Sequence, residues 1–237
     1  MEAVKDVAVL VGDLVNSTKL SFSQYVNTSA SVYESATGGA VRVVTDSAFF
    51  PNYIQIQGDG FFCLFHGGQA VQRAVAAGIT LKTFSEKVLV PRMEGLLSPR
   101  TPKTGFKAGV AIGTLAAKRV GRRGVNDIVS AGKPVNWAFK CAQAANRHQL
   151  IPTERAFNQI RDNDYLRWSC GCDGEGNPSS VSDLWHTTTV TKLPAEHMNC
   201  YQLDASWCDI HGDEFAAAIV AGETVRPDMP HHYSSTS

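Results

Sequence analysis

The sequence has no excess charge of either sign and no long apolar segment. Its 22 lysine and arginine residues balance 22 aspartate and glutamate residues, so no bulk field would recruit nucleic acid or an anionic membrane. The longest apolar run, residues 215–222, is far shorter than the roughly 20 residues that a membrane span needs. Charged residues surround the first apolar strand, so no signal peptide is expected. These absences predict a soluble cytoplasmic protein without nucleic-acid or membrane partners.

What the chain does have is enough length and apolar content for a full core. Its 237 residues, 43% of them hydrophobic, fit one α/β domain with an extension. We expect strands at residues 7–11, 39–45, 54–56, 61–65 and 107–112, and helices at residues 18–36, 69–88, 132–147 and 153–160. Residues 91–103 should form an exposed connection, and residues 121–124 the turn of a hairpin. Strands and helices therefore interleave in an α+β pattern.

Two aspartates stand beside small-residue turns at the ends of predicted strands. Asp13 follows the first apolar strand, and Asp59 occupies the Gly-Asp-Gly turn of a predicted hairpin. Asn16, Ser17 and Thr18 then offer helix-capping side chains and backbone N–H groups that suit a phosphate. Either aspartate alone could be only a helix cap or a common turn residue. Together they could hold a pair of Mg²⁺ ions, which is an arrangement used in phosphoryl transfer.

A third segment, residues 132–142 (GKPVNWAFKCA), predicts a turn followed by a helix. Asn136 and Lys140 are four residues apart and therefore share one helical face. An amide and a cation on one face can grip a ribose and a phosphate. A solvated helix face is the alternative.

In this order and spacing, the segments resemble the catalytic domain of the class III nucleotide cyclases over residues 5–160. The resemblance implies a ferredoxin-like (βαββαβ) α+β cyclase fold at residues 1–163. A C-terminal extension with cysteines and tryptophans, residues 164–226, would pack on this domain. Residues 227–237 would form a disordered tail.

The resemblance also implies roles for single residues. Asp13, Leu14 and Asp59 would form the site of two Mg²⁺ or Mn²⁺ ions, while Asn136 would orient the ribose and Lys140 would stabilise charge at the α-phosphate. In this family the metals and the Asn136 helix come from different subunits. A homodimer with composite active sites follows, and a monomer should be inactive.

The substrate positions depart from both purine patterns of the family. Lys140 replaces the usual arginine and lacks its planar fork. Gln55, four residues before Asp59, replaces the lysine or glutamate that reads a purine, and Val129 replaces a polar residue. The expected substrate-binding residues are Asn16, Ser17, Thr18, Gln55 and Val129.

This combination resembles the pyrimidine cyclases of bacterial anti-phage defence, as do the segments at residues 170–172, 183–185, 201–203 and 207–212. It implies that UTP is converted to cyclic UMP, a second messenger that a separate cyclic-nucleotide-binding effector reads. CTP remains open because a glutamine amide can serve either pyrimidine. An adenylate cyclase and an inactive nucleotide-binding homologue are the further alternatives.

The sequence gives only weak candidates for the basic residue that contacts the triphosphate. The Lys-Gly motif that the family uses is absent, and Lys192 is a loose candidate. Arg119 belongs to a basic cluster with Lys118, Arg122 and Arg123 that could reach the phosphates, although a solvated loop is favoured.

The six cysteines fall into two groups. Cys63 and Cys141 have apolar neighbours and are expected in the core. The others could assemble a zinc site with histidines, the candidates being Cys170, Cys172, Cys200, Cys208, His186, His197 and His211. The paired Cys-x₂-Cys spacing of structural zinc is absent, so reduced cytosolic thiols are favoured.

Overall fold

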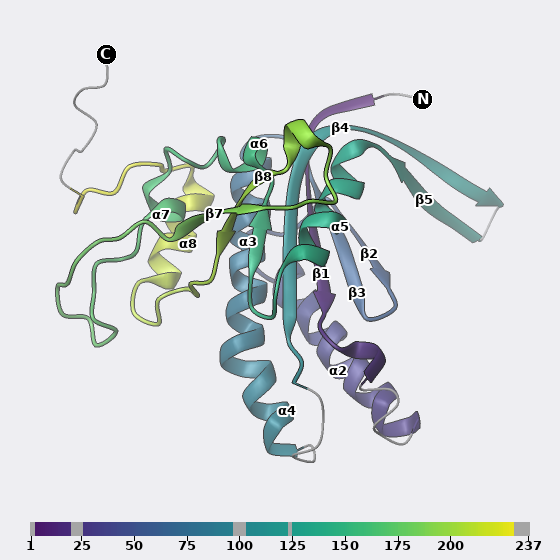
Figure 1. Ribbon diagram of the computed structural model, residues 1–237, viewed down its shortest axis with the longest axis horizontal. Coiled ribbons are helices and arrows are strands. Elements are labelled where there is room, and N and C mark those ends of the chain that lie inside the picture. Colours follow the sequence, from purple (N-terminus) through teal and green to yellow (C-terminus); the bar gives the residue numbers. More distant parts are fainter. Residues whose placement is uncertain (1–2, 20–25, 97–102, 123–124, 230–237) are drawn as a thin grey trace.

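The computed structural model describes residues 3–19, 26–96, 103–122 and 125–229, which form a mixed α+β structure (Figure 1). The strands are β1 (Ala3–Leu14), β2 (Tyr53–Gln57), β3 (Gly60–Phe65), β4 (Phe106–Arg122), β5 (Val125–Ala131), β6 (Leu150–Pro152), β7 (Trp185–Thr189) and β8 (Asn199–Leu203). The helices are α2 (Val26–Thr45), α3 (Ala70–Phe84), α4 (Val90–Leu96), α5 (Lys133–Ala144), α6 (Glu154–Phe157), α7 (Asp164–Arg167) and α8 (Gly212–Ala221), with a π-helix η1 (Ser85–Leu89) and a 3₁₀ helix η2 (Ala195–His197).

One sheet runs through the described part of the chain in the order β2-β3-β1-β4-β6-β8-β7, and β5 pairs with β4. The first four strands of this order, with α2 and α3 between them, give the succession β1-α2-β2-β3-α3-β4. The expected ferredoxin-like cyclase fold is therefore confirmed. Strand β1 lies at its centre and is antiparallel to both β3 and β4.

The central strand separates two cores because successive side chains leave it on opposite faces. Ala8, Leu10 and Leu14 pack with residues of α2 and α3 in the larger core. Val9 and Val11 belong to a second core with residues of α5. By this alternation Asp13 lies on the α5 face of the sheet.

The close approach of α5 to the sheet depends on a glycine in β4. A Cβ on Gly109 would lie 2.2 Å from the Ala138 carbonyl oxygen and 2.4 Å from the Ala142 nitrogen. The helix backbone therefore rests directly on this strand. Any larger residue at Gly109 would push α5 outward.

Two expected elements were wrong. Residues 39–45 were expected as a strand because they are rich in valine, but they form the end of α2. Ala36, Ala40 and Val44 are fully buried at a spacing of four residues, so tertiary packing selects the helix over β-propensity.

Residues 91–96, expected as an exposed connection, continue from η1 into α4. Pro91 lies within this continuous helical run, directly after the π-helical turn in which the Val90 N–H bonds to the Ser85 carbonyl, so the α-helical hydrogen-bond pattern is already interrupted there.

Other expected elements are present among the described residues, some of them shorter than expected. The helix expected at residues 153–160 is only α6, and the helix expected at residues 132–147 ends with α5 at Ala144. The expected helix at residues 18–36 is helical at 17–19 and from residue 26, while residues 20–25 lie outside the description. Thr153 caps α6 as expected, since its Oγ1 accepts a hydrogen bond from the Ala156 N–H at 3.4 Å. Most of the expected disordered tail, residues 230–237, lies outside the described residues.

Residues after 163 join the same sheet, because β8 pairs with β6 and β7. They also contact α3. The Trp207 backbone N–H and its indole Nε1–H donate to the hydroxyls of Thr83 and Thr80, both at 2.9 Å. The buried Lys82 donates to Ser206 Oγ at 3.0 Å. The boundary at residue 163 stays a prediction. Among the described residues, no helix has both the length and the apolar character needed to cross a membrane.

Candidate active site

The structure brings the two predicted metal aspartates together at the end of β1. Asp13 pairs with Lys107 of β4, and the β2–β3 hairpin flanks β1 on the other side. A Cβ on Gly60 would lie 2.7 Å from the Gly12 carbonyl oxygen and 3.6 Å from Asp13 Oδ1. Glycine at this position therefore lets the hairpin turn, which carries Asp59, lie directly against Asp13.

The electrostatics of this pair suit a divalent cation. Burial raises the pKa of the Asp13 carboxyl, Lys107 opposes this, and the charge of Asp59 raises the Asp13 pKa further. Lys107 Nζ lies 3.3 Å from Asp13 Oδ2. Two neighbouring carboxylates, one of them half-buried, are costly unless a cation compensates them. Their hard oxygen atoms are the ligands that Mg²⁺ and Mn²⁺ prefer, so the residues fit the predicted metals.

Leu14 can take part in a metal site only through its backbone. Its side chain is 2% exposed and packs in the larger core. The carbonyl oxygen is then the one group of Leu14 that could serve as a ligand.

The predicted phosphate loop follows β1 directly. Asn16 adopts the left-handed conformation with φ of 59°, and its Nδ2 donates to the Lys103 carbonyl at 2.8 Å. The Asn16 side chain therefore fastens the loop to the segment before β4. Ser17 and Thr18 begin a helical segment at residues 17–19. The start of a helix is a place where proteins commonly bind anions.

Helix α2 ties this loop to the aspartate hairpin. The Tyr33 hydroxyl donates to the Ser17 carbonyl, and Thr37 Oγ1 donates to the Asp59 carbonyl at 3.4 Å. Tyr33 and Thr37 are four residues apart and therefore lie on one face of α2. One helix thus holds both parts of the predicted metal and phosphate site.

The second half of the predicted site lies on the outward face of α5. Asn136 is exposed and Lys140 is half-exposed, whereas the opposite face of the helix is buried against the sheet. Gln143, three residues after Lys140, shares this outward face. Its Oε1 accepts a hydrogen bond from Lys192 Nζ at 3.1 Å. The loose triphosphate candidate Lys192 is thereby brought to the helix face that carries Asn136 and Lys140.

The two halves of the site are separated within one chain. Asn136 lies on the turn of α5 that covers β4 between Gly109 and Gly113, whereas Asp13 pairs with Lys107. About four residues of strand, or roughly 13 Å, lie between these positions. Asn136 also points away from the sheet. A single chain therefore does not place Asn136 beside the two aspartates.

Gln55 lies on the same face of the sheet as Asp13. It pairs with Phe62, and Phe62 packs under α5 with its ring 6.2 Å from that of Phe139. Residues directly opposite each other in an antiparallel pair share a face. The structure thus places the predicted base reader, the aspartate pair and α5 on one side of the sheet.

Arg119 and Val129 lie in the β4–β5 hairpin, which projects from the rest of the sheet (Figure 1). Their backbones pair with Ile128 and Lys118. The side chains of residues 117–131 lie outside the description. Their predicted contacts to the triphosphate and the base stay predictions.

Sequence reasoning missed Lys107. Its ammonium is the described cation that contacts Asp13. The available signal was a charged residue at the start of β4, followed by a stretch without charges up to Ala117.

Comparisons with known proteins give close relatives. No model of a known protein family matches the chain. A uridylate cyclase of Micromonospora echinofusca is 42% identical over 234 residues, which cover 95% of this chain and 73% of the relative. A uridylate cyclase of Propioniciclava tarda is 41% identical over 228 residues, covering 95% and 71%. Among solved structures, the adenylyl cyclase CyaB from P. aeruginosa matches with a TM-score of 0.66 and 17% identity, covering 87% of this chain and 97% of that one.

Proposed function

The chain belongs to the uridylate cyclases, within the class III nucleotide cyclase fold, and on this basis we propose that it converts UTP to 3′,5′-cyclic UMP and pyrophosphate. The observation that carries the chemistry is the meeting of Asp13 and Asp59 at the end of β1. The relationship to the two uridylate cyclases carries the choice of a pyrimidine substrate. Cyclisation of a nucleotide is a phosphoryl transfer, for which paired carboxylates are suited.

Asp13, Asp59 and the Leu14 carbonyl would hold two Mg²⁺ or Mn²⁺ ions. When bound, such ions supply the positive charge that activates a hydroxyl oxygen and neutralises a triphosphate. The raised pKa of Asp13 supports this assignment because it reflects burial and a neighbouring carboxylate. Lys107 then compensates part of the carboxylate charge from β4.

The remaining residues would position the nucleotide. Asn136 would orient the ribose, and Lys140 would stabilise the charge that develops at the α-phosphate. The 3′-oxygen forms a bond to the α-phosphorus while the bond to pyrophosphate breaks, and the hydroxyl proton is released. The backbone N–H groups of Ser17 and Thr18 would receive the leaving phosphates, with Lys192 as a further cation. Such catalysis rests on positioning and charge stabilisation.

We infer that the active form is a homodimer in which each site draws on both chains. Support comes from the separation of roughly 13 Å along the sheet between the positions of Asn136 and Asp13. An amide side chain cannot bridge this distance to a ribose held at the aspartates. A second copy related by a two-fold axis would supply its own α5 to the site.

Gln55 would read the base. Uracil offers a carbonyl acceptor and an N–H donor on its pairing edge, and a glutamine amide can satisfy both. Cytosine offers an amino donor and a ring acceptor, which the same amide could serve after a flip. Cytidylate cyclase activity is therefore the second candidate, and the test below separates it.

The purified protein should be incubated with Mg²⁺ or Mn²⁺ and each of the four ribonucleoside triphosphates, and the products identified by mass. We expect cyclic UMP from UTP, lost in Asp59→Asn and retained in Asp46→Asn, an exposed aspartate on the far end of α2. Cyclic CMP as the main product would show that CTP, and not UTP, is the preferred substrate. Cyclic AMP alone would overturn the pyrimidine proposal. No product from any triphosphate would favour a nucleotide-binding protein.

We further propose that cyclic UMP acts as a second messenger in anti-phage defence and is read by a separate effector. The resemblance to the defence-associated pyrimidine cyclases supports this. Cells that express the chain with the genes around it should accumulate cyclic UMP on infection and resist phage. The same cells with Asp59→Asn should do neither. Equal plating of phage on both strains would contradict the defence role and leave the enzymatic activity untouched.

A further inference from the structure

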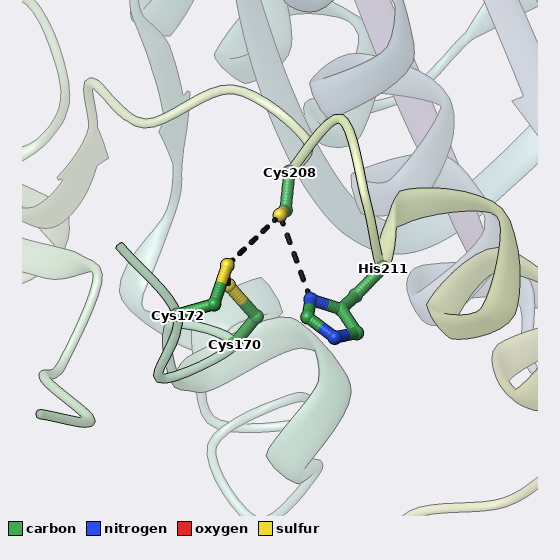
Figure 2. A group of neighbouring side chains, drawn as sticks. All are labelled: Cys170, Cys172, Cys208 and His211. Atoms are coloured by element: carbon green, nitrogen blue, oxygen red, sulfur yellow. Dashed lines mark hydrogen bonds between the residues drawn. The ribbon is translucent and has the colours of Figure 1, made fainter. Parts of the chain in front are cut away.

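Four potential metal ligands meet in the C-terminal extension, far from the two aspartates in the sequence (Figure 2). Cys170 and Cys172 lie in the loop after α7, while Cys208 and His211 lie just before α8. Their ligand atoms are all within 4.8 Å of one another. The Sγ atom of Cys172 lies 3.1 Å from that of Cys170 and 3.5 Å from that of Cys208. Cys208 Sγ lies 3.7 Å from His211 Nδ1.

These separations are near, and for the sulfur pairs somewhat shorter than, those around a tetrahedral zinc ion. Zinc binds thiolate sulfur at about 2.3 Å, so two sulfurs of a tetrahedral site lie about 3.8 Å apart. We propose that Cys170, Cys172, Cys208 and the Nδ1 atom of His211 bind one structural Zn²⁺ ion. With four protein ligands the coordination is complete, which is typical of structural zinc and leaves no position for a substrate.

The ligand spacing explains why the sequence alone did not favour this site. The second pair, Cys208 and His211, has the two-residue separation of a zinc motif, but a histidine takes the place of the second cysteine. The first pair, Cys170 and Cys172, is one residue shorter than usual. Of the other candidates, Cys200 is buried in β8, and it does not belong to the cluster.

A disulfide does not account for the same geometry. The sulfur separations of 3.1 and 3.5 Å exceed the bonded distance of about 2.05 Å. All described cysteines are free thiols. A bond between any two of the cluster sulfurs would also leave the third cysteine and the histidine without a role. A single ion uses all four groups.

The surroundings suit a negatively charged zinc–thiolate centre. The Ile210 backbone N–H donates to Cys208 Sγ at 3.4 Å, and such hydrogen bonds to the sulfur are common at metal-bound thiolates. Three thiolates and a neutral imidazole leave a net charge of −1 on a Zn²⁺ centre. The buried guanidinium of Arg226 holds the Cys170 loop, because its Nη2 donates to the Cys170 carbonyl at 3.1 Å and its Nη1 to the Ser169 carbonyl at 2.7 Å. Its charge is paired with Asp228, whose Oδ2 lies 2.6 Å from Nη2.

The position of the site indicates what the ion would hold together. Cys208 follows Trp207, whose two N–H groups are fastened to Thr80 and Thr83 of α3. His211 immediately precedes α8, which packs into the larger core through Phe215. The ion would therefore join the loop after α7 to both α8 and α3. It would fix the extension to the catalytic part of the chain.

The first experiment measures metal in untagged protein purified without chelator from zinc-supplemented cells. We expect about one zinc per chain by elemental analysis, in the absence of added Mg²⁺ or Mn²⁺. Replacement by Co²⁺ should give a thiolate-to-cobalt charge-transfer band and the intense visible bands of a tetrahedral centre. If elemental analysis found iron instead of zinc, the proposed ligands would stand and the identity of the ion would be corrected. No bound transition metal, or an intact mass 2 Da below that of the reduced chain (one disulfide), would overturn the proposal.

Variants then assign the ion to these residues. His211→Ala should lose the zinc, whereas His186→Ala, an exposed histidine of the same extension, should keep it. His211→Cys restores a fourth ligand and should recover the metal, so a loss in His211→Ala cannot be explained by misfolding alone. Retention of a full zinc equivalent in both His211→Ala and Cys208→Ser would place the metal elsewhere and refute the site. This outcome does not depend on cyclase activity.

Discussion

Mixing two inactive variants would show whether each active site is built from both chains. Asp59→Asn removes a predicted metal-binding carboxylate, and Asn136→Ala removes the predicted ribose contact on α5. In the proposed homodimer each variant alone would damage both sites. The positions of Asn136 and Asp13 lie roughly 13 Å apart along one sheet, so the proposal requires the intact groups to meet across an interface.

The expected recovery follows from the symmetry of the dimer. In an equimolar mixture with free exchange, about half of the dimers contain one chain of each kind. In such a dimer one site combines the intact aspartates of one chain with the intact Asn136 of the other, and the second site carries both defects. About one quarter of the wild-type activity should therefore return. Cyclic UMP formation from UTP, measured in the equimolar mixture without separating the dimers, provides the assay. Mixed dimers isolated by tandem purification should reach about one half of the wild-type activity.

A matched mixture controls for nonspecific stabilisation. Asp13→Asn combined with Asp59→Asn damages the same half of the site in both chains, so this pair should recover no activity. If the Asp59→Asn and Asn136→Ala mixture also stayed inactive while mixed dimers were present, the composite site would be refuted. Activity in an isolated monomer of the wild-type protein would refute it as well.

Three further predictions concern single positions of the site. Lys140→Ala should lower kcat by about 10²–10³-fold, the effect of removing one charge-stabilising donor, with an unchanged melting temperature. Gly60→Ala should lower kcat by about 10²-fold because its Cβ would meet the Gly12 carbonyl at 2.7 Å and displace the hairpin, whereas Gly68→Ala, with open space around it, should be silent in the same assay. In metal-free protein the free energy of unfolding should fall as pH rises from the ordinary aspartate pKa through the raised pKa of folded Asp13, because the folded state holds that proton more tightly. Denaturant titrations across this pH range measure the free energy of unfolding, and its fall with pH should be absent in Asp13→Asn. An identical pH profile for both proteins would contradict the assignment.

Local sequence patterns were sufficient for the parts of the fold that depend on neighbouring residues. The hairpin around Asp59, the cap at Thr153 and the helix that carries Asn136 all follow from turn residues, capping residues or helical spacing. The end of α2 could not be predicted in this way. Its valines favour a strand, and the burial of Ala36 and Ala40 under the sheet becomes visible only when the sheet is in place.

Contacts between distant segments account for the rest of what the sequence missed. Lys107 became relevant only through the register that pairs it with Asp13. The cysteine cluster joins residues 170–172 to residues 208–211, which are distant in the sequence, and the hydrogen bonds of Trp207 to α3 hold the second of these segments. Lys192 had no motif to support it, and its place beside α5 depends on the hydrogen bond to Gln143.

The extension therefore acts at two separate places. On one side, β8 continues the sheet from β6, and the connection between β7 and β8 carries Lys192 to the outward face of α5. On the other side, the proposed zinc ion would fasten the loop after α7 to α8 and α3. The strand pairing that positions Lys192 does not involve the zinc ligands. Loss of the ion should consequently weaken the attachment of α8 before it disturbs the face of α5 that carries Asn136 and Lys140.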